Sequence, residues 1–384
     1  MEIGLQIFNR QTKCLRAMGH SLIHQVQESK WQRIPQFFVL FLVVSAQYPM
    51  INYAIFHKDD LELVTGCMSI AFTNMLSSIK VLTFLINKIK FLEIINELKT
   101  MWQNSGEYGF NYIKGSNIMA DRVVNFYFYS VFFTGFYFLL TPLAKIAWAK
   151  INHMPIIREL PMPMRFFFDA EHSPVYEYAY IYTGCVTVIV VSYVVAIDGL
   201  FIAFAIHLRS HFRLLQHYIE NNSFKSNEAA INTNIRSYVK YHSKLLRLAE
   251  QICQTFKPII FVQFLITSLQ VCVLVYQLVT NMNNVMIFVV YVAFLVSILI
   301  QLLIYCYGGE MLKTESSMVA TSVQISKYYN LSPKYRKVLC LVLMRSQKPV
   351  IVKAGFYVAS LENFMTILKA AMSYITLIQS LEQI

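Results

Sequence analysis

Long apolar runs recur along the chain, and shorter polar stretches separate them. Seven of these runs are long enough for a membrane-spanning helix, which needs roughly 20 mostly apolar residues. Only helices and closed barrels pair all their backbone polar groups inside a bilayer, and runs of this length favour helices. The pattern therefore predicts an all-α protein with seven transmembrane helices. The predicted spans are Gln36–Phe56, Val64–Ile86, Val124–Trp148, Ala179–His207, Pro258–Thr280, Val285–Tyr307 and Ala354–Leu381.

The polar connections after the fourth and sixth spans also show helical periodicity. Apolar side chains recur at the spacing of one helix face in residues 208–219 and again in 238–256. A third such stripe, 335–343, follows Ser332 and Pro333, which are a helix-capping residue and a proline suited to the first helical turn. We therefore predict a packed helical region beside the membrane.

Basic residues differ in abundance between the two sides of the predicted bundle. Lys and Arg are frequent in the N-terminal segment and after spans two, four and six, whereas the other connections hold only Lys58, Lys150, Arg158 and Arg165. Because basic loops stay in the cytosol, we predict a cytosolic N-terminus and an extracellular C-terminus. The resulting segments are a cytosolic N-terminal segment (1–35), spans one to four (36–207), a cytosolic anchor segment (208–257), spans five and six (258–307), a second cytosolic anchor segment (308–353) and a pore-lining span seven (354–384).

Composition agrees with a protein that lies in a lipid bilayer and excludes several functions. The chain is 56% hydrophobic and only 14% charged, whereas soluble domains carry about a quarter charged residues. The net charge of +12 comes from the predicted cytosolic loops, so it does not indicate a nucleic-acid partner. The seven cysteines lack CxxC or metal-like spacing, and the chain has no HExxH or glycine-rich phosphate loop. We expect no enzyme and no cofactor.

His207 and His211 lie four residues apart on a predicted helix, with His217 nearby. This spacing suits a metal ion, but no neighbouring carboxylate or cysteine completes a ligand set. We therefore interpret the histidines as part of a partly solvated cytosolic helix and predict no metal site.

Ionisable residues also fall inside the predicted spans. Asp198 lies toward the cytosolic end of span four, where it is either a functional group or the acceptor of a structural hydrogen bond from a neighbouring helix. We favour the structural interpretation. Lys80 and Lys145 lie near span ends, so we expect their amines to extend to the headgroup region.

The last predicted span carries a polar stripe along one face. At 100° per residue, Glu362, Thr366, Lys369, Ser373 and Ser380 fall in one narrow sector. Such a stripe is typical of a close-packed helix seam, and equally of the wall of a water-filled pore. Periodicity alone leaves both interpretations open.

A chemoreceptor coupled to a G protein is an alternative with the same number of spans. Receptors of that class have an extracellular N-terminus, opposite to the orientation that the basic loops predict. Asp121-Arg122 resembles a fragment of their DRY motif, but it precedes the third span instead of following it. The chain also has no NPxxY motif.

Several stretches resemble the insect odorant receptors. The C-terminal third contains IYCYGGEML, SPKYRKVLCLVLMRSQKP and KAGFYVASLENFMTILKAAMSYITL, and LPMPMRFFFDAEHSPVYEYAYIYTG resembles the second extracellular loop of that family. Gustatory receptor channels, a sister group, are a poorer match. They end on Thr-Tyr, five apolar residues and Gln-Phe, whereas here Ser373-Tyr374 is followed by four residues and Gln379-Ser380.

The resemblance implies an odorant-binding subunit of a heteromeric ligand-gated cation channel, in the plasma membrane of olfactory sensory neuron dendrites. In that family four subunits assemble through the cytosolic helices, and a shared co-receptor combines with a tuning subunit. The short loop after span four resembles a tuning subunit. The last span is expected to line the pore for permeating cations. The implied pore and gate residues are Ser373, Leu377, Ser380 and Leu381.

The resemblance also implies where the ligand lies. The family binds odorants within each subunit, in the outer half of the bundle between spans two and six. Those segments are apolar with few polar groups, which suits a small neutral volatile molecule. The candidate ligand-binding residues are Phe72, Thr73, Leu76, Phe133, Phe136, Tyr137, Leu140, Cys185, Ile189, Met286, Val290 and Tyr291.

Overall fold

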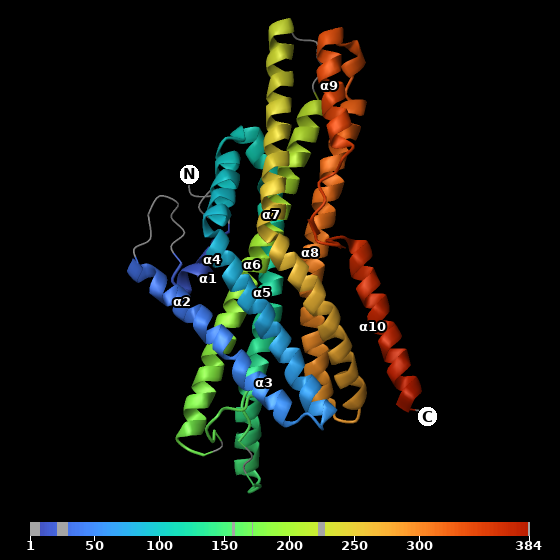
Figure 1. Ribbon diagram of the computed structural model, residues 1–384. Helices are drawn as coiled ribbons and strands as arrows, with labels where there is room; N and C mark the ends of the chain where they lie inside the picture. The colour runs from blue at the N-terminus through green and yellow to red at the C-terminus, as the bar shows by residue number, and fades with distance from the viewer. Residues whose placement is uncertain (1–7, 21–29, 156–157, 171, 222–226, 383–384) are drawn as a thin grey trace.

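The computed structural model describes residues 8–20, 30–155, 158–170, 172–221 and 227–382, and side chains of the last helix up to residue 373. This part of the chain is almost wholly helical, as predicted, with one short hairpin (Figure 1). The elements are α1 (Asn9–Ala17), α2 (Lys30–Ser45), α3 (Gln47–Phe56), α4 (Leu61–Gln103), α5 (Gly106–Ile151), α6 (Val175–Glu220), α7 (Glu228–Thr280), α8 (Val285–Ile325), a 3₁₀ turn (Tyr328–Asn330), α9 (Pro333–Ser346), β1 (Lys353–Ala354), β2 (Tyr357–Val358) and α10 (Leu361–Glu382).

The first six predicted spans coincide with these helices. In the described residues six helical segments are long and apolar enough to cross a membrane, and each overlaps one predicted span. Several of these helices are much longer than the span, because they continue beyond the bilayer thickness into the region predicted to be cytosolic. The last helix, α10, is 22 residues long and is the seventh.

The predicted start of the last span, at Ala354, is wrong. Ala354 belongs to β1, which pairs with β2 in an antiparallel hairpin, and α10 begins only at Leu361. Gly355 turns the chain with a positive φ of 61°, a conformation that favours glycine. The side chain of Ser360 then accepts a hydrogen bond from the backbone N–H of Asn363 at 3.3 Å and so caps the helix.

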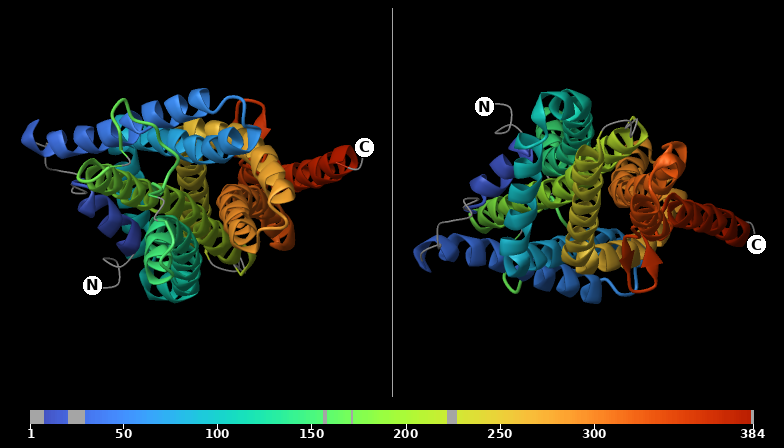
Figure 2. Two further views of the ribbon diagram at one scale, coloured as in Figure 1. Left: turned by 90° about the horizontal axis from the view of Figure 1, so that it is seen from below. Right: turned by 90° about the horizontal axis from the view of Figure 1, so that it is seen from above.

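The helix α6 runs through the middle of the bundle. It packs against α4, α5, α7 and α8, and Figure 2 shows it between them along the bundle axis. Its most apolar window is 83% buried. A helix that is apolar on all sides fits only the interior of a protein or a lipid environment, and here neighbouring helices provide that interior.

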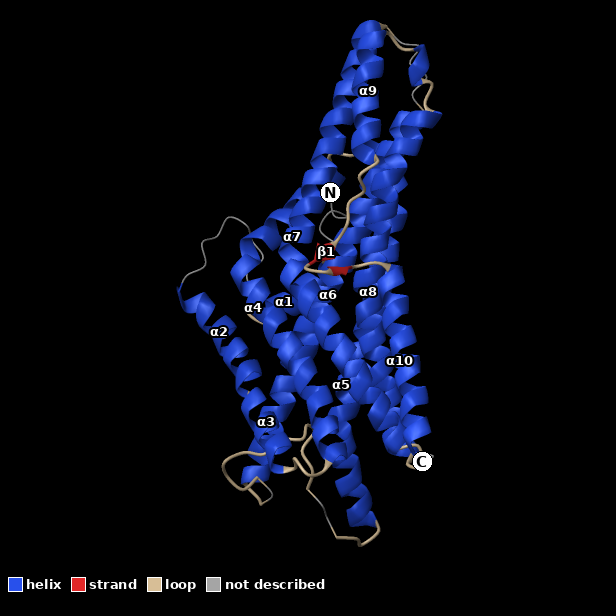
Figure 3. Cartoon of the chain, turned by 45° about the vertical axis from the view of Figure 1, so that its right-hand side comes forward, coloured by secondary structure: helices blue, strands red, loops and turns tan. Residues whose placement is uncertain are grey.

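The two ends of the bundle carry different connections. The turns α3–α4, α5–α6 and α7–α8 lie at one end, and α10 runs toward it (Figure 3). The connections α4–α5, α6–α7 and α8–α9 lie at the other end, where α7, α8 and α9 project beyond the rest of the molecule (Figure 1). The helices therefore alternate in direction as the predicted topology requires; the side of the membrane that each end faces stays a prediction.

The apolar core of the bundle continues into the projecting end. The predicted stripe 238–256 is helical, with Leu245, Leu248, Ile252 and Phe256 fully buried, and α9 buries Tyr335. The packed helical region is thus confirmed within the described residues. Each helix covers its apolar face with another helix, which is the arrangement that amphipathic periodicity favours.

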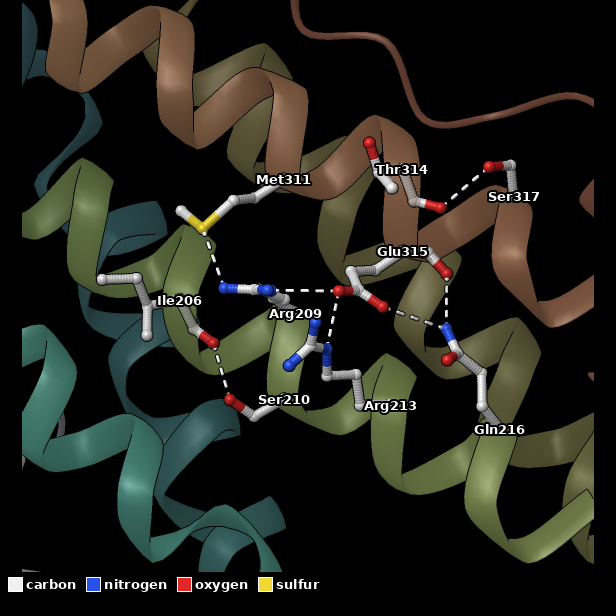
Figure 4. Close-up of polar contacts among 9 residues, drawn as sticks. All are labelled: Ile206, Arg209, Ser210, Arg213, Gln216, Met311, Thr314, Glu315 and Ser317. Carbon is white, nitrogen blue, oxygen red and sulfur yellow. Dashed lines mark hydrogen bonds and ion pairs between the residues drawn. The ribbon is translucent and has the colours of Figure 1, made fainter.

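An ion-pair cluster joins α6 to α8 in the projecting end (Figure 4). Glu315 of α8 is almost fully buried and accepts hydrogen bonds from Nε of Arg209 at 3.1 Å and Nε of Arg213 at 2.6 Å. The side-chain amide of Gln216 donates to the backbone carbonyl of Glu315 at 2.9 Å. The same amide also donates to Oε2 of Glu315 at 3.3 Å. Two cations and an amide therefore hold one carboxylate, and this fixes the register of α6 against α8.

Candidate ligand cavity

A cavity of about 110 Å³ lies among α4, α5, α6 and α8, with one wall residue from the α5–α6 connection. Protein cavities of about 150 Å³ bind benzene, so this space suits a small organic molecule. Wall residues on each helix recur at the spacing of one helix face. The wall consists of Ile70, Thr73, Asn74, Tyr127, Val131, Thr134, Gly135, Phe138, Met162, Thr187, Val190, Val191, Val194, Phe294, Ser297, Ile298 and Gln301.

Most of the cavity wall is aliphatic or aromatic, and its hydroxyl groups have protein partners. The hydroxyls of Thr134 and Ser297 lie 2.8 Å apart, and the hydroxyl of Thr187 donates to the carbonyl of Thr183 at 2.8 Å. The hydroxyl of Thr73 accepts a hydrogen bond from the side chain of Gln270 at 2.8 Å. Because these groups bond to the protein, the wall offers mainly dispersion and apolar contact to a ligand.

The α5–α6 connection covers the cavity and is held to α3 and α4. Met162 contributes its side chain to the wall. The backbone N–H of Arg165 donates to the carbonyl of Pro49 at 2.9 Å, and the thiol of Cys67 donates to the carbonyl of Pro163 at 3.5 Å. The cover is therefore an ordered part of the bundle.

The floor of the cavity is polar, formed by Tyr127 and Gln301, and a buried ion pair lies behind these two side chains. Nζ of Lys80 lies 2.7 Å from Oδ1 of Asp198, and both side chains are 0% exposed. The hydroxyl of Tyr127 and the amide nitrogen of Gln301 donate to Oδ2 of Asp198 at 2.7 Å and 2.8 Å. The hydroxyl of Tyr305 also donates to Asp198. Four side chains from α4, α5 and α8 thus converge on one carboxylate of α6, which confirms an interhelical hydrogen bond at Asp198.

The expectation that Lys80 reaches the headgroup region is wrong. Lys80 lies on the face of α4 that meets α6, and its amine is directed at the carboxylate of Asp198. A buried cation is stable only with such a partner and hydrogen bonds to it. The side chain of Lys145 is 56% exposed, and its Nζ lies 2.6 Å from Oε2 of Glu159. Its extension to the headgroup region stays a prediction.

The two histidines of α6 are not partly solvated as expected, since His207 and His211 are both fully buried. Nδ1 of His211 lies 2.7 Å from the hydroxyl of Tyr241, and the ring of His207 packs edge-on against Phe8. In the described part of the chain no three metal-binding side chains come together. The environment of this pair is that of core residues.

The predicted ligand-binding residues whose side chains are described occupy four kinds of position: on the cavity wall, buried elsewhere, half-buried and exposed. Thr73 lies on the cavity wall. Leu76 and Ile189 are buried, whereas Phe72, Val290 and Tyr291 are half-buried. The side chain of Met286 lies outside the described residues. The remaining five are exposed on the surface of the single chain: Phe133, Phe136, Tyr137, Leu140 and Cys185. Their role in ligand binding stays a prediction.

The large aromatic residues of α5 were predicted to bind the ligand, but the cavity lies on a different face of that helix. Val131, Thr134, Gly135 and Phe138 line it. Small and hydroxyl-bearing residues at helical spacing are the sequence signal that marks this face, because they leave room next to a neighbouring helix. On α8 the wall begins at Phe294, about one to two turns farther along the helix than the predicted residues.

The helix α10 packs on one face and leaves its polar stripe uncovered. Ile367 and Ala371 contact a cluster of apolar residues on α7 and α8 that includes Val271 and Leu295. The exposed residues of the opposite sector are Glu362, Thr366, Lys369 and Ser373. The side chains of the predicted gate residues Leu377, Ser380 and Leu381 lie outside the described residues.

Comparison with known proteins identifies the family of this fold. A family model described as 7tm Odorant receptor matches residues 60–372. Odorant receptor 82a of Drosophila melanogaster is 44% identical over 98% of this chain and 100% of that relative. Odorant receptor 47a of the same fly is 26% identical over 99% of this chain and 100% of that relative.

Solved structures give the same result for the fold. The structure of the insect olfactory receptor OR5 from Machilis hrabei in complex with eugenol aligns with a TM-score of 0.80 at 18% identity, over 97% of each chain. The bundle described above is therefore the fold of a seven-transmembrane chemoreceptor. This chain belongs to the insect odorant receptor family, whose members are receptors and not enzymes.

Proposed function

We propose that the chain is the odorant-binding tuning subunit of a heteromeric, ligand-gated, non-selective cation channel. It detects small volatile organic molecules from the plasma membrane of olfactory sensory neuron dendrites. The single observation that carries the proposal is the largely apolar cavity inside the bundle. A neutral molecule fits such a wall, whereas an ion would lose its hydration without compensation.

The uncovered stripe of α10 supports the channel part of the proposal. A chain that leaves Glu362, Thr366, Lys369 and Ser373 exposed along one side of a membrane helix needs water or a polar partner there. Placed at the axis of a tetramer, the stripe lines an aqueous path for cations. The projecting end, with its long helices α7, α8 and α9, offers the surface through which a co-receptor subunit joins the assembly.

The test is electrical recording from cells that express this chain with and without the co-receptor. A suitable panel holds hexanol, hexyl acetate, heptanone, benzaldehyde, limonene and eugenol, the last because the OR5 complex contains it. We expect fast odorant-evoked currents only when both subunits are present, and their persistence when G-protein signalling is blocked. Currents that disappear under the block would instead indicate a receptor coupled to a G protein.

The gate has its own test. Leu377 and Leu381 lie on one helix face, so at a tetramer axis they form apolar rings that exclude water. Replacing Leu377 with Ser should raise the current measured without odorant, normalised to surface protein. The control is Ile375→Ser, which by helical periodicity lies on the packed face of α10 with Ala371. A current without odorant no larger than that of the control would show that Leu377 is not a gate residue.

A further inference from the structure

The polar cluster around Asp198 connects most of the membrane helices. The carboxylate belongs to α6, Lys80 to α4, Tyr127 to α5, and Gln301 and Tyr305 to α8. The cluster continues to α7, because the side-chain amide of Gln263 donates to Oε1 of Gln301 at 3.0 Å. Five successive helices therefore meet through one continuous set of hydrogen bonds.

Two members of this cluster are also part of the cavity wall. Tyr127 and Gln301 face the cavity, whereas Lys80, Asp198 and Tyr305 do not line it. The hydrogen bonds to Asp198 use the hydroxyl proton of Tyr127 and one amide proton of Gln301. The carboxylate therefore orients the Tyr127 hydroxyl and the Gln301 amide, and hence the polar atoms that they present to a molecule in the cavity.

Stability alone is a weak reason for this arrangement. Burying two charges requires desolvation that their attraction only roughly offsets, and apolar residues of similar size often replace such a pair without loss of stability. The cluster does, however, reach the cavity through Tyr127 and Gln301, and the hydrogen bond between Gln263 and Gln301 extends it to α7 and α8. Those are the helices that carry α10 through Val271, Val275, Leu295 and Leu299.

We propose that Lys80 and Asp198 are positioning residues of the odorant site. They hold Tyr127 and Gln301 at the cavity floor and link occupancy of the cavity to α7 and α8. The inference rests on the proposed function, and assigns the buried ion pair a role in odorant sensitivity beyond the stability of the bundle.

The test removes both charges together and measures the response. The double variant Lys80→Met/Asp198→Leu keeps the side-chain sizes close and leaves no charge unpaired. The matched control is Lys145→Met/Glu159→Leu, which removes an exposed ion pair away from the cavity. Each is expressed with the co-receptor, and the dose–response curve is recorded with the panel odorant that evokes the largest wild-type current, at equal surface protein.

A positioning role predicts that the half-maximal concentration of the first double variant rises about tenfold, within the usual range of coupling between linked groups. The control variant should match the wild type. A purely structural pair predicts a wild-type dose–response curve once surface protein is equal, and this result would overturn the proposal.

Two single hydroxyl deletions test the proposal if the double variant fails to reach the cell surface. Tyr127→Phe keeps the ring in the wall and removes the hydroxyl between cavity and carboxylate, whereas Tyr305→Phe removes a hydroxyl that bonds to Asp198 outside the cavity. We expect a larger shift in half-maximal concentration for Tyr127→Phe. Equal curves for Tyr127→Phe and the wild type would sink the proposal. If the wild type responds to no odorant, the proposed function fails first, and this inference with it.

Discussion

The helices α5 and α6 have the same length, 46 residues, and both line the cavity, yet their surroundings are opposite. The most apolar window of α6 is 83% buried within the chain, whereas that of α5 is 11% buried. Neighbouring helices pack against α6 along most of its length. One face of α5 lines the cavity, while Phe126, Phe133 and Phe136 are exposed on the chain surface.

This difference shows that apolar residues of a membrane protein have two distinct environments, the lipid and the packed interior. Lipid tails are as apolar as leucine, so an exposed aromatic residue of α5 gains little from moving into the bundle. Residues of α6 instead fill space between helices, where size and hydrogen bonding are both constrained. The helix α6 therefore contributes the carboxylate at the centre of the polar cluster, whereas α5 places one face on the cavity wall and leaves another exposed on the surface of the single chain.

The strongest test of this comparison separates the buried ion pair of α6 from the exposed pair of α5. Lys80→Met leaves the carboxylate of Asp198 buried without a cation, and breaking such a pair costs about 3–5 kcal/mol. We expect a severe loss of surface protein and thermal stability. Lys145→Met breaks an exposed pair worth about 1 kcal/mol or less and should be nearly neutral. Equal stability of the two variants would contradict the scaffold role of α6.

A second test probes the contact between the two helices. A Cβ at Gly135 of α5 would lie 2.8 Å from Cγ2 of Val191 on α6, closer than packed carbons allow. Gly135→Ala should therefore destabilise the chain by about 1–3 kcal/mol and narrow the cavity. Thermal unfolding and odorant dose–response curves measure these effects. The control is Gly184→Ala, whose Cβ would meet only Leu139 at 3.9 Å; a similar loss there would show that close packing is not the cause.

A third test compares the two faces of α5. Phe138 lines the cavity, and Phe136 is exposed on the opposite side. Phe138→Ala should shift the half-maximal odorant concentration about tenfold, because it removes apolar contact with the ligand. Phe136→Ala should leave the dose–response curve unchanged at equal surface protein. A larger shift for Phe136→Ala than for Phe138→Ala would instead favour the exposed aromatic residues as the ligand site.

The smallest expected effect concerns two glycosylation sequons, one after α6 and one after α8. Asn221-Asn222-Ser223 and Asn330-Leu331-Ser332 are glycosylation sequons that the topology places in the cytosol. Asn221→Gln and Asn330→Gln should therefore leave the electrophoretic mobility of the chain unchanged. A tag after Ile384 should stain on intact cells. A mobility shift on enzymatic deglycosylation would reverse the orientation.

Much of the architecture was predictable from local pattern. The length of the apolar runs favours membrane-spanning helices, since a helix of this length crosses the bilayer with its backbone polar groups paired internally. The stripes 238–256 and 335–343 likewise predicted helices that are present and buried on their apolar faces. The boundary before α10 was not predictable in this way, because Ala354 and its neighbours are apolar whether they form a helix or a hairpin.

What the sequence determined by itself was the number of spans, the helical region beyond them and the apolar character of the segments around the cavity. Only the tertiary structure decided which face of α5 meets α6, that Lys80 turns inward to Asp198, and that Tyr127 and Gln301 share the cavity and the cluster. The reason is physical. Helix formation and membrane insertion depend on residues close together in the chain, whereas Lys80 and Asp198 meet only because α4 and α6 pack side by side.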